Sequence, residues 1–125
     1  MAEWVVRGTG VATLGFAVFH ALIPRFMDWK TDLESLFIGN RKTVLALNIG
    51  VTYLLAAIGL LCLLAAPDLL ATDVGRLVLW GLLGFWVLRT GIQAVVYGYE
   101  WKPSYAFTAA FVAMSAAYAY ALFAG

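Results

Sequence analysis

The residues with the greatest chemical capacity in this sequence are polar side chains set inside long apolar runs. His20, Asn48, Arg89 and Gln93 each lie in such a run. A guanidinium stays charged under ordinary conditions, so Arg89 cannot avoid the cost of burial by losing a proton. An imidazole donates or accepts hydrogen bonds and titrates near neutral pH. These residue types suit the binding of an anionic or carbonyl-bearing group of a ligand.

Helical spacing predicts which of these side chains share a face. Trp86, Arg89 and Gln93 follow steps of three and four residues, which keep one face of an α-helix. Phe16 and His20 share a face in the first run for the same reason. Polar groups that face lipid carry a desolvation cost, so we expect these faces to point inward.

Depth along the helices predicts that the polar residues lie at one level. At ~1.5 Å per residue, His20 lies ~6 Å inside Pro24 and Gln93 ~8 Å inside Gly98. We therefore expect a pocket in one leaflet, with Arg89 facing the interior and meeting a polar group from another helix. The candidate ligand-binding residues are His20, Asn48, Arg89, Gln93 and Thr108 for a polar head, and Phe16, Trp86 and Phe111 for an apolar part.

Each of these residues also has a structural interpretation. Arg89 can tie the helices together as a clamp, or extend its stem to the lipid headgroups. Asn48 and Gln93 can form interhelical hydrogen bonds, commonly worth ~0.6–2 kcal/mol in membranes. His20 can bond a carbonyl one turn earlier.

The sequence assigns no reaction, cofactor or metal. It lacks CxxC, HExxH, GxxxxGK[ST] and GxSxG motifs. His20 is the single histidine and Cys62 the single cysteine, so no set of metal ligands is predicted. Whether the protein is an enzyme stays open.

Composition excludes several classes of protein. Hydrophobic types make up 64% of the 125 residues and charged types 12%, and the mean hydropathy is +0.91. A soluble domain of this length has too little interior for so much apolar surface, and a disordered chain is excluded for the same reason. A net charge of +1, with Lys and Arg spread along the chain, excludes a nucleic-acid binder. An integral membrane protein remains.

The elements that must position these residues are four apolar runs, at about residues 5–23, 43–66, 75–98 and 104–123. About 20 helical residues cross the hydrocarbon core. Short links favour antiparallel neighbours. The predicted fold is an all-α integral membrane protein, a single domain over residues 1–125 with four transmembrane helices in an up-down antiparallel bundle. We expect the first two spans to stop at Pro24 and Pro67, and residues 32–37 to form a short surface helix.

The positive charges predict an orientation. One side holds Arg25, Lys30, Arg41, Lys42 and Lys102, and the other side holds Arg7 and Arg76. The positive-inside rule then places the first and third loops in the cytoplasm and both termini outside, in a cytoplasmic (inner) membrane.

Small residues predict close helix contacts. Gly84, Gly91 and Gly98 recur every seven residues on the face opposite Arg89, and alanines recur every four residues from 109 to 121. Such stripes let helix backbones approach one another. We expect one to serve the bundle and the other a homo-oligomer.

The leading functional hypothesis is the binding of a lipid-soluble small molecule in the inner leaflet. A quinone, a fatty acid or a lipid headgroup would each fit the predicted pocket. One alternative is a small homo-oligomeric transporter or channel, in which the polar residues line a path. Another is an accessory subunit of a larger membrane complex, with the glycine stripe as the docking face.

Overall fold

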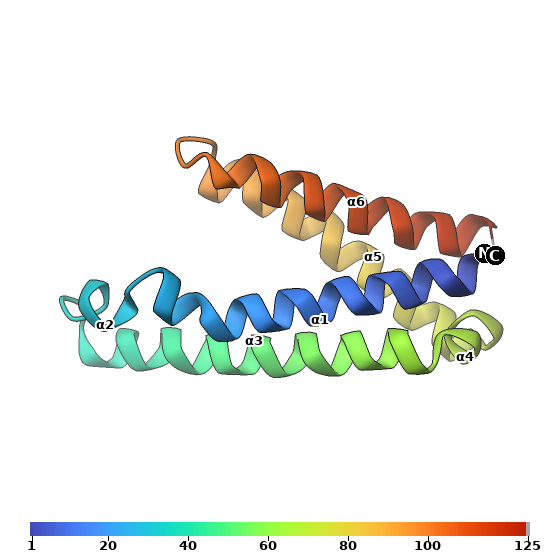
Figure 1. The fold of residues 1–125 in the computed structure, drawn as a ribbon, viewed down its shortest axis with the longest axis horizontal. Coiled ribbons are helices and arrows are strands. Elements are labelled where there is room, and N and C mark those ends of the chain that lie inside the picture. Colours follow the sequence, from blue (N-terminus) through green and yellow to red (C-terminus); the bar gives the residue numbers. More distant parts are fainter. Residues whose placement is uncertain (125) are drawn as a thin grey trace.

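The computed structural model describes residues 1–124, and they form helices joined by short connections (Figure 1). Four helical segments are long and apolar enough to cross a membrane. They are α1 (Ala2–Phe26), α3 (Ile38–Leu64), α5 (Asp73–Ile92) continued by the π-helix η1 (Gln93–Tyr97), and α6 (Pro103–Ala124). The short helices α2 (Trp29–Asp32) and α4 (Ala66–Ala71) lie in the first two connections. The all-helical class and the four candidate spans are thus confirmed.

The helix ends differ from the predicted ones around both prolines. The first helix passes through Pro24 and ends at Phe26, because a side chain from another helix takes over the hydrogen bond that proline cannot make. The second long helix ends at Leu64, and Pro67 lies in the first turn of α4, where no N–H is needed. Thr72 then caps α5 by accepting the N–H of Gly75 at 2.9 Å.

The first connection contains a surface helix at a different place from the predicted one. A single turn forms at Trp29–Asp32 rather than at residues 32–37. Asp28 precedes it with a left-handed backbone (φ 48°), a conformation that Asp tolerates better than most residues. The short helix therefore begins directly after Asp28, ahead of the start at residue 32 that the apolar pattern predicts.

The four long helices are arranged as two pairs. The first pair is α1 and α3, which pack side by side along their length, and the second pair is α5 with η1 and α6. The contact between the pairs is made mainly by α1 against α6. Figure 1 shows that the pairs meet near α4 and the two chain ends, here called the closed end. They diverge toward α2 and the connection after η1, here called the open end.

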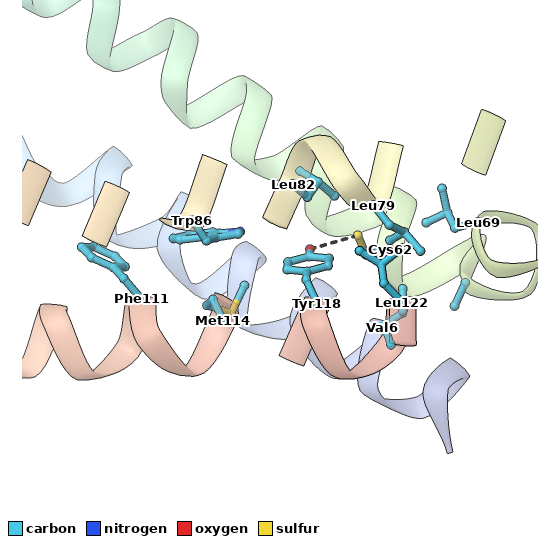
Figure 2. Close-up of a cluster of buried hydrophobic side chains, with 12 residues drawn as sticks. Val6, Cys62, Leu69, Leu79, Leu82, Trp86, Phe111, Met114, Tyr118 and Leu122 are labelled. Atoms are coloured by element: carbon cyan, nitrogen blue, oxygen red, sulfur yellow. Dashed lines mark hydrogen bonds between the residues drawn. The ribbon is translucent and has the colours of Figure 1, made fainter. Parts of the chain in front are cut away.

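The core lies at the closed end and is almost entirely apolar (Figure 2). Tyr118 is fully buried there, and its hydroxyl lies 3.4 Å from the Sγ of Cys62. The hydroxyls of Thr9 and Thr13 bond carbonyls of their own helix, Val6 and Thr9 respectively. The remaining members come from all four long helices and α4, and include Leu69, Leu79, Leu82, Met114 and Leu122.

The close contact of α1 with α3 involves a glycine pair outside the predicted stripe. A Cβ placed on Gly10 would lie 2.7 Å from the carbonyl oxygen of Gly59, so α1 and α3 touch through their backbones. Gly84, Gly91 and Gly98 have open space beside them instead. Within the single chain the glycine stripe therefore meets no other helix, because α5 turns that face away from them.

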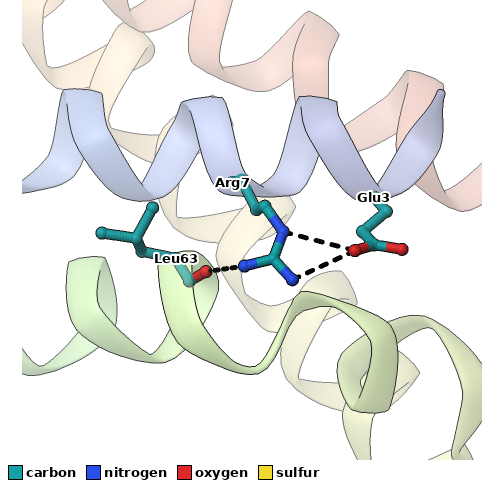
Figure 3. Close-up of polar contacts among 3 residues, drawn as sticks. All are labelled: Glu3, Arg7 and Leu63. Atoms are coloured by element: carbon teal, nitrogen blue, oxygen red, sulfur yellow. Dashed lines mark hydrogen bonds and ion pairs between the residues drawn. The ribbon is translucent and has the colours of Figure 1, made fainter.

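In each pair, an arginine near the start of the first helix donates a hydrogen bond to a carbonyl near the end of the second helix. Arg7 of α1 donates to the carbonyl oxygen of Leu63 at the end of α3, and forms an ion pair with Glu3 at 3.0 Å (Figure 3). Arg76 of α5 donates to the carbonyl oxygen of Leu122 near the end of α6 at 2.8 Å. The last carbonyls of a helix lack partners within it, so both arginines act as C-terminal caps.

The two pairs repeat one another in sequence and in burial. Residues 13–23 (TLGFAVFHALI) and 82–92 (LLGFWVLRTGI) are identical at five positions. In this register the buried positions 6, 10, 13 and 17 of α1 match the buried positions 75, 79, 82 and 86 of α5. Arg7 corresponds to Arg76 in this register, and His20 corresponds to Arg89. The buried positions 55, 59 and 62 of α3 match 114, 118 and 121 of α6 with a different offset, which is ten residues shorter.

Candidate functional site

Three aromatic rings join the two helix pairs beyond the core. Phe16 of α1, Trp86 of α5 and Phe111 of α6 contact one another with ring centroids 5.2–5.7 Å apart. Figure 2 shows Trp86 and Phe111 at the edge of the core cluster. Aromatic side chains at this spacing add about 0.5–1.5 kcal/mol per pair beyond burial. The structure thus brings together the three aromatic residues named from the sequence.

The aromatic contact continues toward the open end through residues that the sequence analysis missed. Phe107 of α6 stacks with Phe111 at 6.2 Å and lies 5.3 Å from Phe19 of α1. Trp101 stacks on Phe107 at 5.8 Å. This row of rings extends the contact between the two pairs from Phe111 to Phe107 and Trp101.

The guanidinium of Arg89 reaches inward over two rings. Its Cζ lies 4.6 Å from the ring centroid of Phe111 and 5.1 Å from that of Tyr97. Because Phe111 also contacts Phe16 of α1, the cation lies beside the interface between the pairs. His20 follows Phe16 by one helical turn, so the two side chains share a face of α1. His20 and Arg89, the matching positions of the repeat, therefore both lie toward the contact of Phe16 with Phe111.

Arg89 lacks the polar partner that we predicted from another helix. Within residues 1–124 it forms no hydrogen bond or ion pair, and its Nη1 is buried without a partner. The prediction is wrong in this respect because α6 presents the ring of Phe111 here rather than an amide or hydroxyl. Cation–π contacts contribute up to about 2 kcal/mol when desolvated. They leave the buried N–H without an acceptor, which costs about 1–3 kcal/mol.

His20 and Asn48 form a two-point clamp between α1 and α3. Pro24 has no N–H, so the carbonyl of His20, four residues earlier, has no partner within its helix. The Nδ2 of Asn48 donates to that carbonyl at 2.8 Å, and its Oδ1 lies 3.2 Å from the Nδ1 of His20. Both ends of the Asn48 amide are therefore occupied, and Asn48 positions His20 instead of facing a ligand.

Gln93 is buried where α5 changes into the π-helix. Its Nε2 donates to the hydroxyl of Ser104 at 2.7 Å, and that hydroxyl donates to the carbonyl of Gly98 at 2.6 Å. The side chain is 1% exposed, yet its Oε1 has no partner within the described chain. π-helical turns are rare and frequently lie at functional sites.

The unpartnered polar atoms lie on one face of the third span. They are the Nε1 of Trp86, the Nη1 of Arg89 and the Oε1 of Gln93, and all three are buried. Steps of three and four residues place them in a line along α5 and η1. Buried polar groups are normally hydrogen-bonded, and each of these three atoms retains an unused donor or acceptor.

The hydroxyl of Thr108 is less available to a ligand than the sequence suggested, because it already has hydrogen-bond partners. Its hydroxyl donates to the carbonyl of Ser104 at 2.9 Å and lies 3.2 Å from the Tyr99 hydroxyl. The structure thus divides the predicted polar residues between the two helix pairs. His20 and Asn48 belong to the first, whereas Arg89, Gln93 and Thr108 belong to the second.

Two grooves lie on other faces of the molecule. The larger has a volume of about 320 Å³ and is lined by Ala21, Pro24, Leu45, Asn48, Ile49 and Thr52. The smaller, of about 230 Å³, is lined by Val87, Thr90, Val112 and Ser115. The larger groove includes Asn48 of the predicted site residues, but neither groove includes Arg89. The candidate site is therefore the row of buried groups on α5 and η1 rather than either groove. No group of three potential metal ligands occurs in the part of the chain that the structure describes.

Comparisons with protein-family models, curated proteins and solved structures found no match to this chain.

Proposed function

We propose that this protein binds the polar head of a lipid-soluble small molecule between its two helix pairs. The observation that carries the proposal is the buried Nη1 of Arg89, which has aromatic neighbours and no acceptor within residues 1–124. An anionic or carbonyl oxygen would supply that acceptor, and hydrogen bonds to a charged donor are among the strongest in proteins. Phe16, Trp86 and Phe111 would contact the apolar part.

A pocket is favoured over a path through the membrane. The closed end is filled by Tyr118, Cys62 and apolar side chains, and the threonine hydroxyls there already bond their own helix. In the described residues, buried side-chain polar atoms without partners occur only in α5 and η1, from Trp86 toward the other end. This one-sided distribution supports a binding site open to one leaflet.

The proposal includes an arrangement in the membrane. The four spans cross it in up-down antiparallel order, with the open end at the cytoplasmic side of an inner membrane and both termini outside. The Lys and Arg imbalance between the two ends supports this orientation. The open space beside Gly84 and Gly91 supports self-association of the chain through that face of α5.

Native mass spectrometry of matched variants tests the proposal. We expect purified wild-type protein to retain a small molecule after detergent exchange, and Arg89→Met to lose it while staying folded. Arg25→Met is the control, because it removes an exposed cation from the same end. Equal retention by all three proteins would contradict a role for Arg89. An unfolded Arg89→Met with no molecule bound to the wild type would support the structural clamp instead.

A further inference from the structure

The two contacts of Asn48 with His20 fix which nitrogen of the imidazole carries a proton. A carbonyl oxygen can only accept, so the atom of Asn48 that lies 2.8 Å from the carbonyl of His20 must be the Nδ2 donor. The Oδ1 of Asn48 then faces the Nδ1 of His20 at 3.2 Å and can only accept. Nδ1 is therefore the protonated nitrogen, and in the neutral ring Nε2 presents a lone pair.

The half-buried ring of His20 makes its one hydrogen bond within residues 1–124 at Nδ1, which leaves Nε2 free. Arg89, its counterpart in the repeat, offers N–H donors and a positive charge without a carboxylate beside it. The site thus combines one acceptor from α1 with charged donors from α5. A ligand that satisfies both must bring a hydrogen-bond donor and an acceptor, preferably an anionic one.

We propose that the bound molecule is a lipid-soluble carboxylic acid whose carboxyl group is shared between Arg89 and the Nε2 of His20. One oxygen accepts from the guanidinium, and the O–H of the other donates to Nε2. If the proton transfers, the acid O–H bond breaks, an N–H bond forms at Nε2, and the carboxylate stays on Arg89. This inference rests on the proposed function and narrows its ligand class.

Other lipid-soluble groups fit the two residues less well. A quinone carries carbonyl acceptors alone, so it leaves the lone pair of Nε2 facing another acceptor. A phosphodiester linkage brings negative charge but has no hydrogen of its own to donate to Nε2. A methyl ester keeps the carbonyl and the acyl chain of the acid but loses both the O–H and the capacity to ionise.

Competition binding tests the ligand class on the wild-type protein. The probe is tritiated palmitic acid added to purified protein in detergent micelles. We expect unlabelled palmitic acid to displace it, and methyl palmitate and decylubiquinone to be at least about tenfold weaker, the effect of losing one hydrogen bond to a charged group. Equal displacement by methyl palmitate would overturn the proposal.

Two substitutions of His20 test the role of Nε2. The amide of His20→Asn occupies the place of Nδ1 and keeps the donor to Asn48, but it has nothing at the position of Nε2. His20→Gln reaches the position of Nε2. We expect His20→Asn to lose palmitic acid binding about tenfold or more with unchanged thermal unfolding, and His20→Gln to retain more of it. Full binding by a folded His20→Asn would overturn the assignment.

The outcomes separate this inference from the proposed function. If decylubiquinone or phosphatidic acid binds in an Arg89-dependent manner and palmitic acid does not, the pocket stands and the carboxylic acid is wrong. If the wild type binds none of the three, the proposed function itself fails.

Discussion

At the scale of single residues, the clearest result is that Pro24, His20 and Asn48 act as one unit. The proline frees a carbonyl, and the asparagine of the neighbouring helix satisfies it while orienting the imidazole. Pro24 stands four residues after His20 and has no N–H for the carbonyl of His20. The sequence therefore could have predicted a hydrogen-bond donor for that carbonyl on a neighbouring helix at the same depth. Their depths along the helices predicted that both residues lie at one level, but not that the carbonyl freed by Pro24 is what Asn48 binds.

A double-mutant cycle tests this unit. Asn48→Leu should lower the free energy of unfolding by about 1–2 kcal/mol, because it leaves the carbonyl of His20 unpaired in an apolar setting. Pro24→Ala restores an N–H to α1, so the same asparagine substitution should cost less in that background. The measurement is reversible unfolding in detergent micelles for all four proteins. Equal costs in both backgrounds would show that Pro24 and Asn48 are independent.

The environment of Arg89 could be predicted only in part. Helical spacing correctly placed Arg89 on the same face as Trp86 and Gln93, whose polar atoms share its lack of partners. Spacing does not give rotation between neighbouring helices, so it could not show that Phe111, rather than a polar residue, lies under the guanidinium.

At the scale of elements, apolar run length predicted four helices, but the ends of two of them depended on local chemistry. The change to a π-helix at Gln93 was not predictable, because its apolar sequence fits an ordinary α-helix equally well. The bond from the N–H of Gly98 to the carbonyl of Gln93 closes that wider turn, and Gly98 has a positive φ of 65°.

The contact of α1 with α3 gives a prediction at this scale. Gly10→Ala would place a Cβ 2.7 Å from the Gly59 carbonyl oxygen, so the helices must separate. We expect a loss of about 1–3 kcal/mol in the free energy of unfolding. Gly15→Ala is the matched control on the same helix, because nothing lies within 4 Å of a Cβ at that position. Thermal unfolding in detergent compares the two, and equal stability would contradict the backbone contact.

At the scale of the whole molecule, the two pairs resemble one another. Four buried positions of α1 match four of α5, and in the same register His20 of α1 matches Arg89 of α5. The polar faces of the helices could be predicted from the sequence, but this repeat could not. Any two apolar helices share many residues by composition alone, so the repeat becomes visible only when the buried positions and the two arginine caps of the pairs are compared.

The orientation of the whole molecule is open to a labelling experiment. We expect a cysteine at Trp4 to react with a membrane-impermeant maleimide in intact cells, and a cysteine at Ser35 to react only after permeabilisation. The native Cys62 is fully buried and serves as the unlabelled background. Reaction of both positions from the same side would contradict the four-span topology.

The central claim is that Arg89 holds a group that is not part of the described chain. A crystal structure of the protein grown in a lipid mesophase with palmitic acid measures this directly. We predict a non-protein oxygen about 2.7–3.2 Å from the Nη1 of Arg89, with its acyl chain against Phe16 and Phe111. A guanidinium that extends to the headgroup layer, or that bonds only helix carbonyls with no other atom beside it, would contradict the claim.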